Sequence, residues 1–320
     1  MQPGAAHAVI RLASIGSFFA GGRPVTVARQ AAQTIRFSAQ AAIEHDPNGT
    51  FHVEQAYVQS FLPEDAAGRS PLVLVHGGCL TGAMWETTPD GRPGWLEHFL
   101  RAGWPVHVVD GVERGRAGWC ALPGIWPDPP VSRSAEQMWS LYRIGPPGSR
   151  TPFPGQRFPV ASFDTLLLQH VPRWFSTIPA ATAALIAALE RIGPSVLLSH
   201  SNGGLITLAA AWQRPDLVRG LVCVEPSGFP PEPPPRLDGL EALLLLGDFL
   251  DRMPLWRGLG EAMTGLAATM RAAGAAVTDW RLPEQGIAGN SHMMMMDDNG
   301  PAIAARIDAW LRERFLSPAR

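Results

Sequence analysis

The sequence carries little charge and no excess of either sign. Of its 320 residues, 17% are Asp, Glu, Lys or Arg, and the formal net charge is −2 at pH 7. Domains that bind nucleic acid are typically strongly basic, so nucleic acid is excluded as an expected partner. No apolar run is long enough to cross a bilayer as a helix, and we expect no membrane span.

Cysteine is scarce as well. The three cysteines, Cys79, Cys120 and Cys223, have neither the spacing of metal ligands nor the number that a disulfide framework needs. We interpret each as a buried or half-buried small side chain. We expect no metal and no cofactor.

The N-terminus lacks the basic residues that usually open a signal peptide. Residues 8–22 are mostly apolar, but Arg11 interrupts them and no basic residue precedes it. The Gly21-Gly22 pair favours a β-hairpin over residues 9–29 instead. The sequence leaves the compartment open: a cytoplasmic location is favoured, and the periplasm or secretion are the alternatives.

Apolar segments of strand and helix type alternate along the rest of the chain. This alternation predicts an α/β fold with a mostly parallel sheet covered by helices on both faces, in one domain over residues 1–320. The expected strands are residues 51–62, 71–75, 105–109, 196–198, 221–224, 242–246 and 277–282, and the expected helices are residues 95–102, 181–191, 205–214, 259–273 and 302–315.

Residues 111–177 differ from the rest of the chain because Pro, Gly and Trp recur there. A long, loop-rich segment inside a compact domain usually has a function. We interpret it as a cap or lid inserted over an active site. The alternative is a poorly ordered linker, although linkers rarely carry so many aromatic residues.

Ser201 lies at the apex of a strand, turn and helix pattern. An apolar run ends at Ser199-His200, and the helical pattern follows Asn202-Gly203. This context is typical of a nucleophile elbow, whose strained turn requires small flanking residues. Gly203 fits the G-x-S-x-G pattern, whereas Ser199 stands where glycine is usual.

A serine nucleophile needs a base and a carboxylate that orients the base. His292 follows the last expected strand and is the candidate base; His200 adjoins the serine but should point away from it. Glu225 and Asp248 each follow an expected strand, so both are candidates for the acid. The order Ser, Asp or Glu, His is that of α/β hydrolases.

Ester hydrolysis also needs N–H donors for the developing oxyanion. The residue after the nucleophile, Asn202, supplies one of them. The glycine-rich loop that starts at His76 should supply the other, and its position favours Gly78. In that loop His76 is expected to shape the backbone.

The chain resembles an α/β-hydrolase fold serine esterase, and more narrowly a small bacterial esterase group. The matching motifs are the N-terminal Gly16–Arg23 segment, the His76–Gly82 loop, the Ser199-His200-Ser201 elbow, Val224-Glu225-Pro226 and the Gly289–Met295 string. The resemblance implies Ser201 as nucleophile, His292 as base and Glu225, rather than Asp248, as acid. A characterised type of this group has a disulfide between adjacent cysteines in the loop, which Gly78-Cys79 cannot form.

We therefore predict a serine hydrolase that cleaves small-molecule carboxylic esters through an acyl-enzyme. The tryptophans of residues 111–177 and the run Met293–Met296 suggest apolar esters. A lactonase, an amidase, a C–C hydrolase or a non-catalytic binding protein on the same scaffold are the alternatives. A homodimer is a further expectation.

Overall fold

One large sheet organises the molecule. In the residues that the computed structural model describes, 9–66, 68–122 and 124–316, eight strands pair in the order β1-β4-β6-β5-β7-β8-β9-β10. From β6 to β10 all neighbours are parallel, while β1 and β4 are antiparallel. The bounds are β1 (Leu12–Val27), β4 (Gly49–Pro63), β5 (Leu72–Val75), β6 (Val106–Asp110), β7 (Ser195–His200), β8 (Val218–Val224), β9 (Glu241–Leu246) and β10 (Ala276–Arg281).

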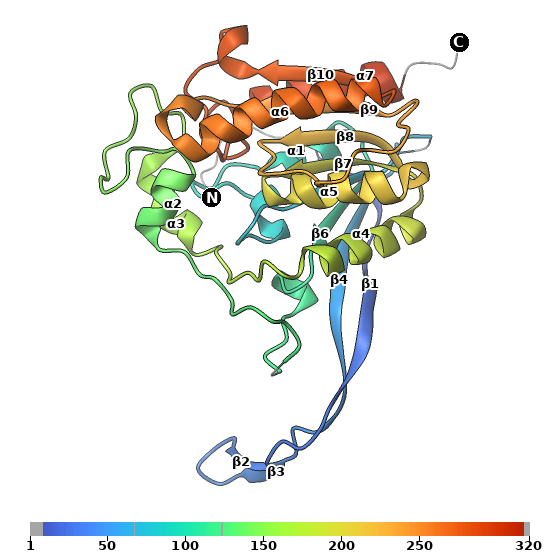
Figure 1. The fold of residues 1–320 in the computed structure, drawn as a ribbon, viewed down its shortest axis with the longest axis vertical. Helices are drawn as coiled ribbons and strands as arrows, with labels where there is room; N and C mark the ends of the chain where they lie inside the picture. Colours follow the sequence, from blue (N-terminus) through green and yellow to red (C-terminus); the bar gives the residue numbers. More distant parts are fainter. Residues whose placement is uncertain (1–8, 67, 123, 317–320) are drawn as a thin grey trace.

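Helices cover both faces of this sheet (Figure 1), which confirms the expected α/β fold. Leu72 and Leu74 of β5 face the core under α1 (Trp95–Arg101) and α7 (Gly300–Phe315). The alternate residues Val73 and Val75 face the core under α4 (Ile178–Ile192), α5 (Asn202–Gln213) and α6 (Pro254–Ala272). Because a parallel strand is buried on both sides, its sequence is a continuous apolar run.

Short 3-10 turns connect several of these elements. Within the described residues they are η1 (Gly82–Trp85), η2 (Gly115–Ala117), η3 (Val160–Ser162), η4 (Pro215–Leu217), η5 (Leu250–Arg252) and η6 (Leu282–Gln285).

The expected hairpin over residues 9–29 is wrong. Residues 12–27 form a single strand, β1, that pairs with β4 and not with itself. Gly21 has the positive φ that suggests a turn, 69°, but a Cβ there would lie 2.7 Å from the Cα of Ala184. The glycine is needed because helix α4 crosses the strand at this point.

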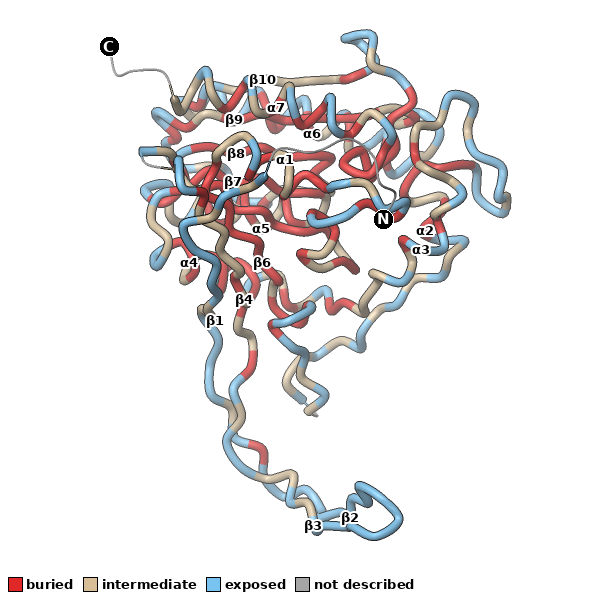
Figure 2. Tube along the Cα trace, turned by 180° about the vertical axis from the view of Figure 1, so that it is seen from behind, coloured by how far each residue is buried: buried red, intermediate tan, exposed pale blue. Residues whose placement is uncertain are grey.

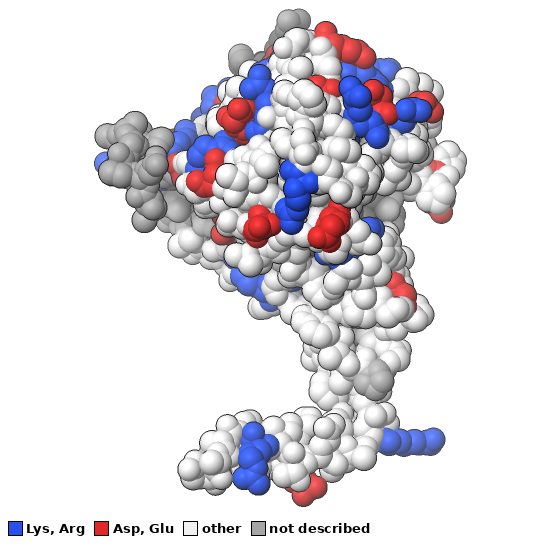
Figure 3. Space-filling model, turned by 90° about the vertical axis from the view of Figure 1, so that its left-hand side faces the viewer, with Lys and Arg blue, Asp and Glu red and all other residues white. Residues whose placement is uncertain are grey.

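The pair β1–β4 extends beyond the body of the molecule as an arm, defined as residues 23–52. Two short strands, β2 (Gln33–Arg36) and β3 (Ala42–His45), close its tip (Figure 1). Figure 2 shows that most of the arm is exposed, and Figure 3 shows that most of its surface is uncharged, while acidic and basic side chains are mixed over the body on that face.

Residues 111–177 lie between β6 and α4 and contain two short helices, α2 (Ala135–Leu141) and α3 (Phe163–Leu167). Trp139, Phe158 and Phe163 are at most 3% exposed and belong to the main core. The segment is therefore packed onto the domain, which excludes the linker interpretation for its described residues.

Candidate active site

Ser201 is held in a strained turn between β7 and α5. Its φ of 51° lies in the left-handed region that non-glycine residues rarely adopt. A Cβ on Gly203 would lie 2.6 Å from the carbonyl oxygen of His76, so the second residue after Ser201 must be glycine. Ser199 is accommodated because its buried hydroxyl accepts a hydrogen bond of 3.0 Å from Thr207. The serine that replaces the usual first glycine of the G-x-S-x-G pattern is thus stabilised by a local hydrogen bond.

The structure brings His292 and Glu225 together. Nδ1 of His292 lies 3.3 Å from Oε2 of Glu225, and both side chains are almost fully buried. His292 lies in the loop after β10, and Glu225 directly follows β8 with a φ of 53°. Burial lowers the pKa of His292, and the Glu225 carboxylate acts in the opposite direction. The imidazole is therefore neutral near pH 7, as a base must be.

Arg143 is a partner of Glu225 that the sequence did not reveal. Its guanidinium donates to both carboxylate oxygens of Glu225, at 2.6 and 2.9 Å, and Arg143 is fully buried. Burial alone would raise the pKa of Glu225, but Arg143 and His292 outweigh burial and lower that pKa to about 2. Gly247 adds a backbone N–H to the same carboxylate at 2.5 Å.

Asp248 is turned away from the histidine ring. Its carboxylate accepts hydrogen bonds from the backbone N–H groups of Phe249 and Gly289, at 2.6 and 2.8 Å. Its own N–H donates to the carbonyl of Asn290. These bonds connect the β9 end to the loop that carries His292, so Asp248 supports the loop and Glu225 faces the ring.

Asp297 fixes the same loop from within. It accepts hydrogen bonds from the Asn290 amide, at 2.9 Å, and from the backbone N–H and hydroxyl of Ser291, at 2.8 and 2.7 Å. Burial raises the pKa of Asp297 to about 7. The run Met293–Met296 packs into the core beside it, at most 2% exposed, and does not line the cavity.

His200 is bonded to the backbone of His292. Its Nε2 donates to the carbonyl oxygen of His292 at 2.9 Å, which leaves Nδ1 unprotonated and buried, with no partner among the described residues. His200 therefore supports the backbone of His292. Burial, and then the neighbouring His292, lower the pKa of His200 well below its usual value.

The glycine loop is shaped by His76. Gly111 donates to Nε2 of His76 at 3.0 Å, so Nδ1 carries the proton and donates to the carbonyl of Gly77 at 2.8 Å. A Cβ on Gly77 would lie 2.5 Å from the His200 ring. In the described part of the chain, the N–H groups of Gly78 and Asn202 have no protein acceptor. Two donors are thus free beside Ser201.

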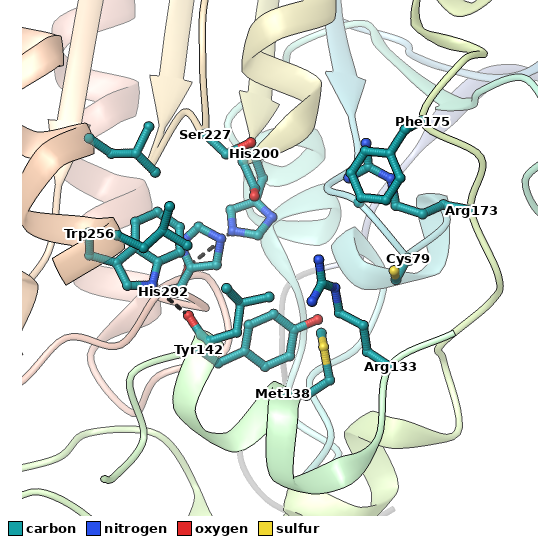
Figure 4. A pocket seen from close by; sticks show the side chains of 15 residues that line it. Cys79, Arg133, Met138, Tyr142, Arg173, Phe175, His200, Ser227, Trp256 and His292 are labelled. Atoms are coloured by element: carbon teal, nitrogen blue, oxygen red, sulfur yellow. Dashed lines mark hydrogen bonds between the residues drawn. The ribbon is translucent and has the colours of Figure 1, made fainter. Parts of the chain in front are cut away.

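Ser201, His292, His200 and Gly78 line one cavity of about 220 Å³ (Figure 4). Its walls combine parts of the sheet edge, of residues 111–177 and of the start of α6. The lining residues are Gly78, Cys79, Arg133, Met138, Leu141, Tyr142, Arg173, Phe175, His200, Ser201, Ser227, Leu255, Trp256, Leu259 and His292. The expected tryptophans Trp119, Trp126, Trp139 and Trp174 are not among them.

The described residues contain neither a metal-binding cluster nor a membrane-spanning helix. No group of three or more His, Cys, Asp or Glu side chains there could hold a metal ion. No helix in that part is long and apolar enough to span a membrane. Cys79 and Cys223 are buried and Cys120 is half-buried, as expected, and the structure has all three as free thiols.

Comparison with known proteins gave two informative similarities. A bacterial esterase of known structure is 33% identical, with a TM-score of 0.84, over 98% of this chain and 99% of that one. A protein of Fungal sp. (strain ATCC 74256), named "Probable secreted lipase phiG", is 26% identical over 81% of this chain and 86% of that one. No protein-family model matches the chain. The bacterial match is long enough to include both the arm and residues 111–177.

Proposed function

Since the chain belongs to the esterase and lipase family of α/β hydrolases, and is a carboxylic ester hydrolase, we propose that Ser201, His292 and Glu225 form its catalytic triad. One observation carries this assignment: the strained Ser201 and the neutral His292 line the same cavity, and the buried Glu225 carboxylate lies behind His292, bonded to Nδ1 of its ring. A hydroxyl, a base and an orienting anion are the parts that acyl transfer needs.

The reaction proceeds in two halves. Ser201 Oγ attacks the ester carbonyl carbon while His292 takes its proton, and the alcohol leaves with that proton. Water then attacks the acyl-enzyme with His292 again as base, which releases the acid and restores Ser201. Glu225 stays ionised throughout, because its pKa of about 2 is far below neutrality, and stabilises the imidazolium. The N–H groups of Gly78 and Asn202 hold the oxyanion.

We also propose that residues 111–177 act as a cap. Six residues of this segment line the cavity: Arg133, Met138, Leu141, Tyr142, Arg173 and Phe175. A wall built from an inserted segment excludes water and selects substrates. The homodimer stays a prediction, supported by the exposed apolar side chains of Phe37 and Ile43 on the arm.

The compartment also stays a prediction. The fungal relative's printed name describes a secreted protein. This supports secretion, one of the two alternatives to the cytoplasmic location that the sequence favoured.

Ser201→Ala tests the proposed triad. We expect ester turnover to fall by at least about a thousandfold, and covalent labelling by a fluorophosphonate probe to disappear. Ser227→Ala is the matched control, because Ser227 lines the same cavity and should remain dispensable for labelling. Retained labelling of Ser201→Ala would assign the nucleophile to another residue.

A further inference from the structure

Two arginines from residues 111–177 line the cavity beside the serine. Arg133 precedes α2 and Arg173 follows α3, and both belong to the cavity wall (Figure 4). An isolated β-bridge between Val131 and Arg173 holds the two stretches together, with backbone hydrogen bonds of 2.8 and 3.1 Å. Backbone pairing therefore fixes both guanidinium groups on the same side of the cavity.

Arg173 is buried with no anion beside it in the described part of the chain. The residue is only 9% exposed, and its Nε finds no hydrogen-bond acceptor among the described residues. The guanidinium covers the ring of Phe175, with Cζ 4.1 Å from the ring centre, and a Cβ on Gly78 would collide with its Nη1. Among the described residues, no carboxylate lies within ion-pair distance of Arg133 or Arg173. Burying an unpaired charge is unfavourable, so the site is incomplete without a negative group.

The nearest carboxylate is already engaged elsewhere. Glu113 accepts hydrogen bonds from Arg114, at 3.0 Å, and from the Thr177 hydroxyl, at 2.6 Å. The charges of Glu113 and Arg114 therefore cancel, and two positive charges remain beside Cys79. Burial lowers the pKa of Arg173, and the charge of Arg114 lowers it further, while Glu113 acts in the opposite direction. A bound anion would relieve both effects.

The other side of the cavity is apolar. Trp256 and Leu259 come from α6, and Leu141 from α2. Figure 4 shows Trp256 on one side and Arg133, Arg173 and Cys79 on the other, with the rings of His200 and His292 between them. An ester whose carbonyl lies at Ser201 therefore directs one substituent to an apolar wall and the other to two guanidinium groups.

We propose that the preferred substrates are short esters that carry a carboxylate on one substituent, held by Arg133 and Arg173. The inference rests on the proposed function of the same cavity. A carboxylate suits this place because its two oxygens match the planar donors of a guanidinium. The cavity of about 220 Å³ is smaller than the ~300–1,000 Å³ typical of ligand pockets, which restricts the substrate to a short chain.

Pairs of esters with matched shape and different charge test the proposal. Monomethyl glutarate is compared with methyl isoheptanoate, and acetoxypropanoate with isoamyl acetate, because an isopropyl group replaces the carboxylate in each neutral partner. The ratio of kcat/KM, charged over neutral, is measured by pH-stat titration for both pairs. We expect a ratio above one for at least one pair, which also identifies whether the charge lies on the acyl or the alcohol side.

Arg133→Gln and Arg173→Gln should each lower that ratio by about tenfold or more, mainly through KM for the charged ester. Arg150→Gln is the matched control, since Arg150 belongs to the same segment and does not line the cavity. Its ratio should equal that of the unmodified protein. Arg173→Lys should recover part of the preference, because the charge returns without the paired donors.

Two outcomes would overturn the proposal: a ratio below one for both pairs, or a ratio that neither glutamine variant changes. If Arg173→Gln does not fold, Arg133→Gln decides alone, because Arg133 is half-exposed and its replacement leaves no buried group unpaired. If Ser201→Ala keeps its activity, the proposed triad fails. If only the charge preference is absent, the triad stands and this inference fails.

Discussion

Arg143 shows how a single buried residue sets the chemistry of the site. A carboxylate buried among apolar groups would be protonated near neutral pH and could not stabilise an imidazolium. The paired donors of Arg143 keep Glu225 ionised, and Glu225 in turn aligns His292. Arg143 also donates to the carbonyl of Asp248, so it joins the two candidate acids that their positions after strands left open.

Replacing each candidate acid by its amide separates their roles. Glu225→Gln should lower kcat by about a hundredfold or more, because the ring loses its orienting anion. Asp248→Asn should lower kcat by less than about tenfold. The asparagine keeps one acceptor for the loop N–H groups, and the side chain at this position is bonded to the loop and not to the ring. A larger loss in Asp248→Asn would reverse the assignment.

The two variants must be compared on folded protein. Glu225→Gln leaves Arg143 as a buried charge without a counter-ion, which costs about 3–5 kcal/mol in such cases. Thermal melts followed by circular dichroism therefore accompany the kinetics, and kcat is measured well below each Tm. If kcat falls while the protein stays folded, the loss is due to the catalytic step and not to unfolding.

The arginines of the site also mark the limit of sequence reasoning at this scale. Ser201 and both candidate acids could be proposed because each follows an expected strand, and the choice of Glu225 came from the family resemblance. Arg143 and Arg173 belong to a segment without periodicity, and they are two of 26 arginines in a chain that has no lysine. Their roles depend on which distant carboxylate or cavity each side chain reaches, and such tertiary contacts cannot be predicted from a local sequence pattern.

At the scale of elements, the strand-to-helix turn and the glycine loop constrain each other. The turn places Ser201 and His200 against the loop, so Gly77 has no room for a side chain. The elbow was predictable because its constraint is local. The role of Gly21 was not, since a Gly-Gly pair fits a turn as well as a close crossing, and only the position of α4 decides between them.

Gly77→Ala tests this mutual constraint. The new Cβ would lie 2.5 Å from Nδ1 of His200, so this ring must move, and it would contact Cβ of Ser201 at 3.4 Å. We expect kcat for a neutral ester to fall by about tenfold or more, because small displacements of reacting groups are costly. Gly228→Ala is the control, since a Cβ there finds no atom within 4 Å. Equal kcat in both variants would contradict the constraint.

For the whole molecule, buried and half-buried histidines link stability to pH. Burial lowers the pKa of His76, His107 and His170 to about 4, and lowers those of His200 and His292 as well. Below the ordinary pKa of about 6.5, the unfolded chain binds protons that the folded chain excludes. Their contribution is therefore complete above pH 6.5 and is lost as the pH falls toward 4. Asp297 acts with the opposite sign, because its pKa is raised to about 7.

We expect Tm to fall steadily between pH 6.5 and pH 4, because several histidines oppose two carboxyl groups, Asp297 and Glu113, whose pKa values burial raises. Each histidine shifted to about 4 contributes at most roughly 3 kcal/mol, so three of them approach the ~5–15 kcal/mol by which a domain is stable. Melts across this range measure the slope. His107→Gln should reduce the slope of Tm against pH. This ring is suitable because it is not part of the proposed triad and bonds only to Ser60 among the described side chains. Asp297→Asn should make the slope of Tm against pH steeper, because it removes a group that opposes the histidines. A Tm that is constant over this range would contradict the buried, neutral state assigned to these rings.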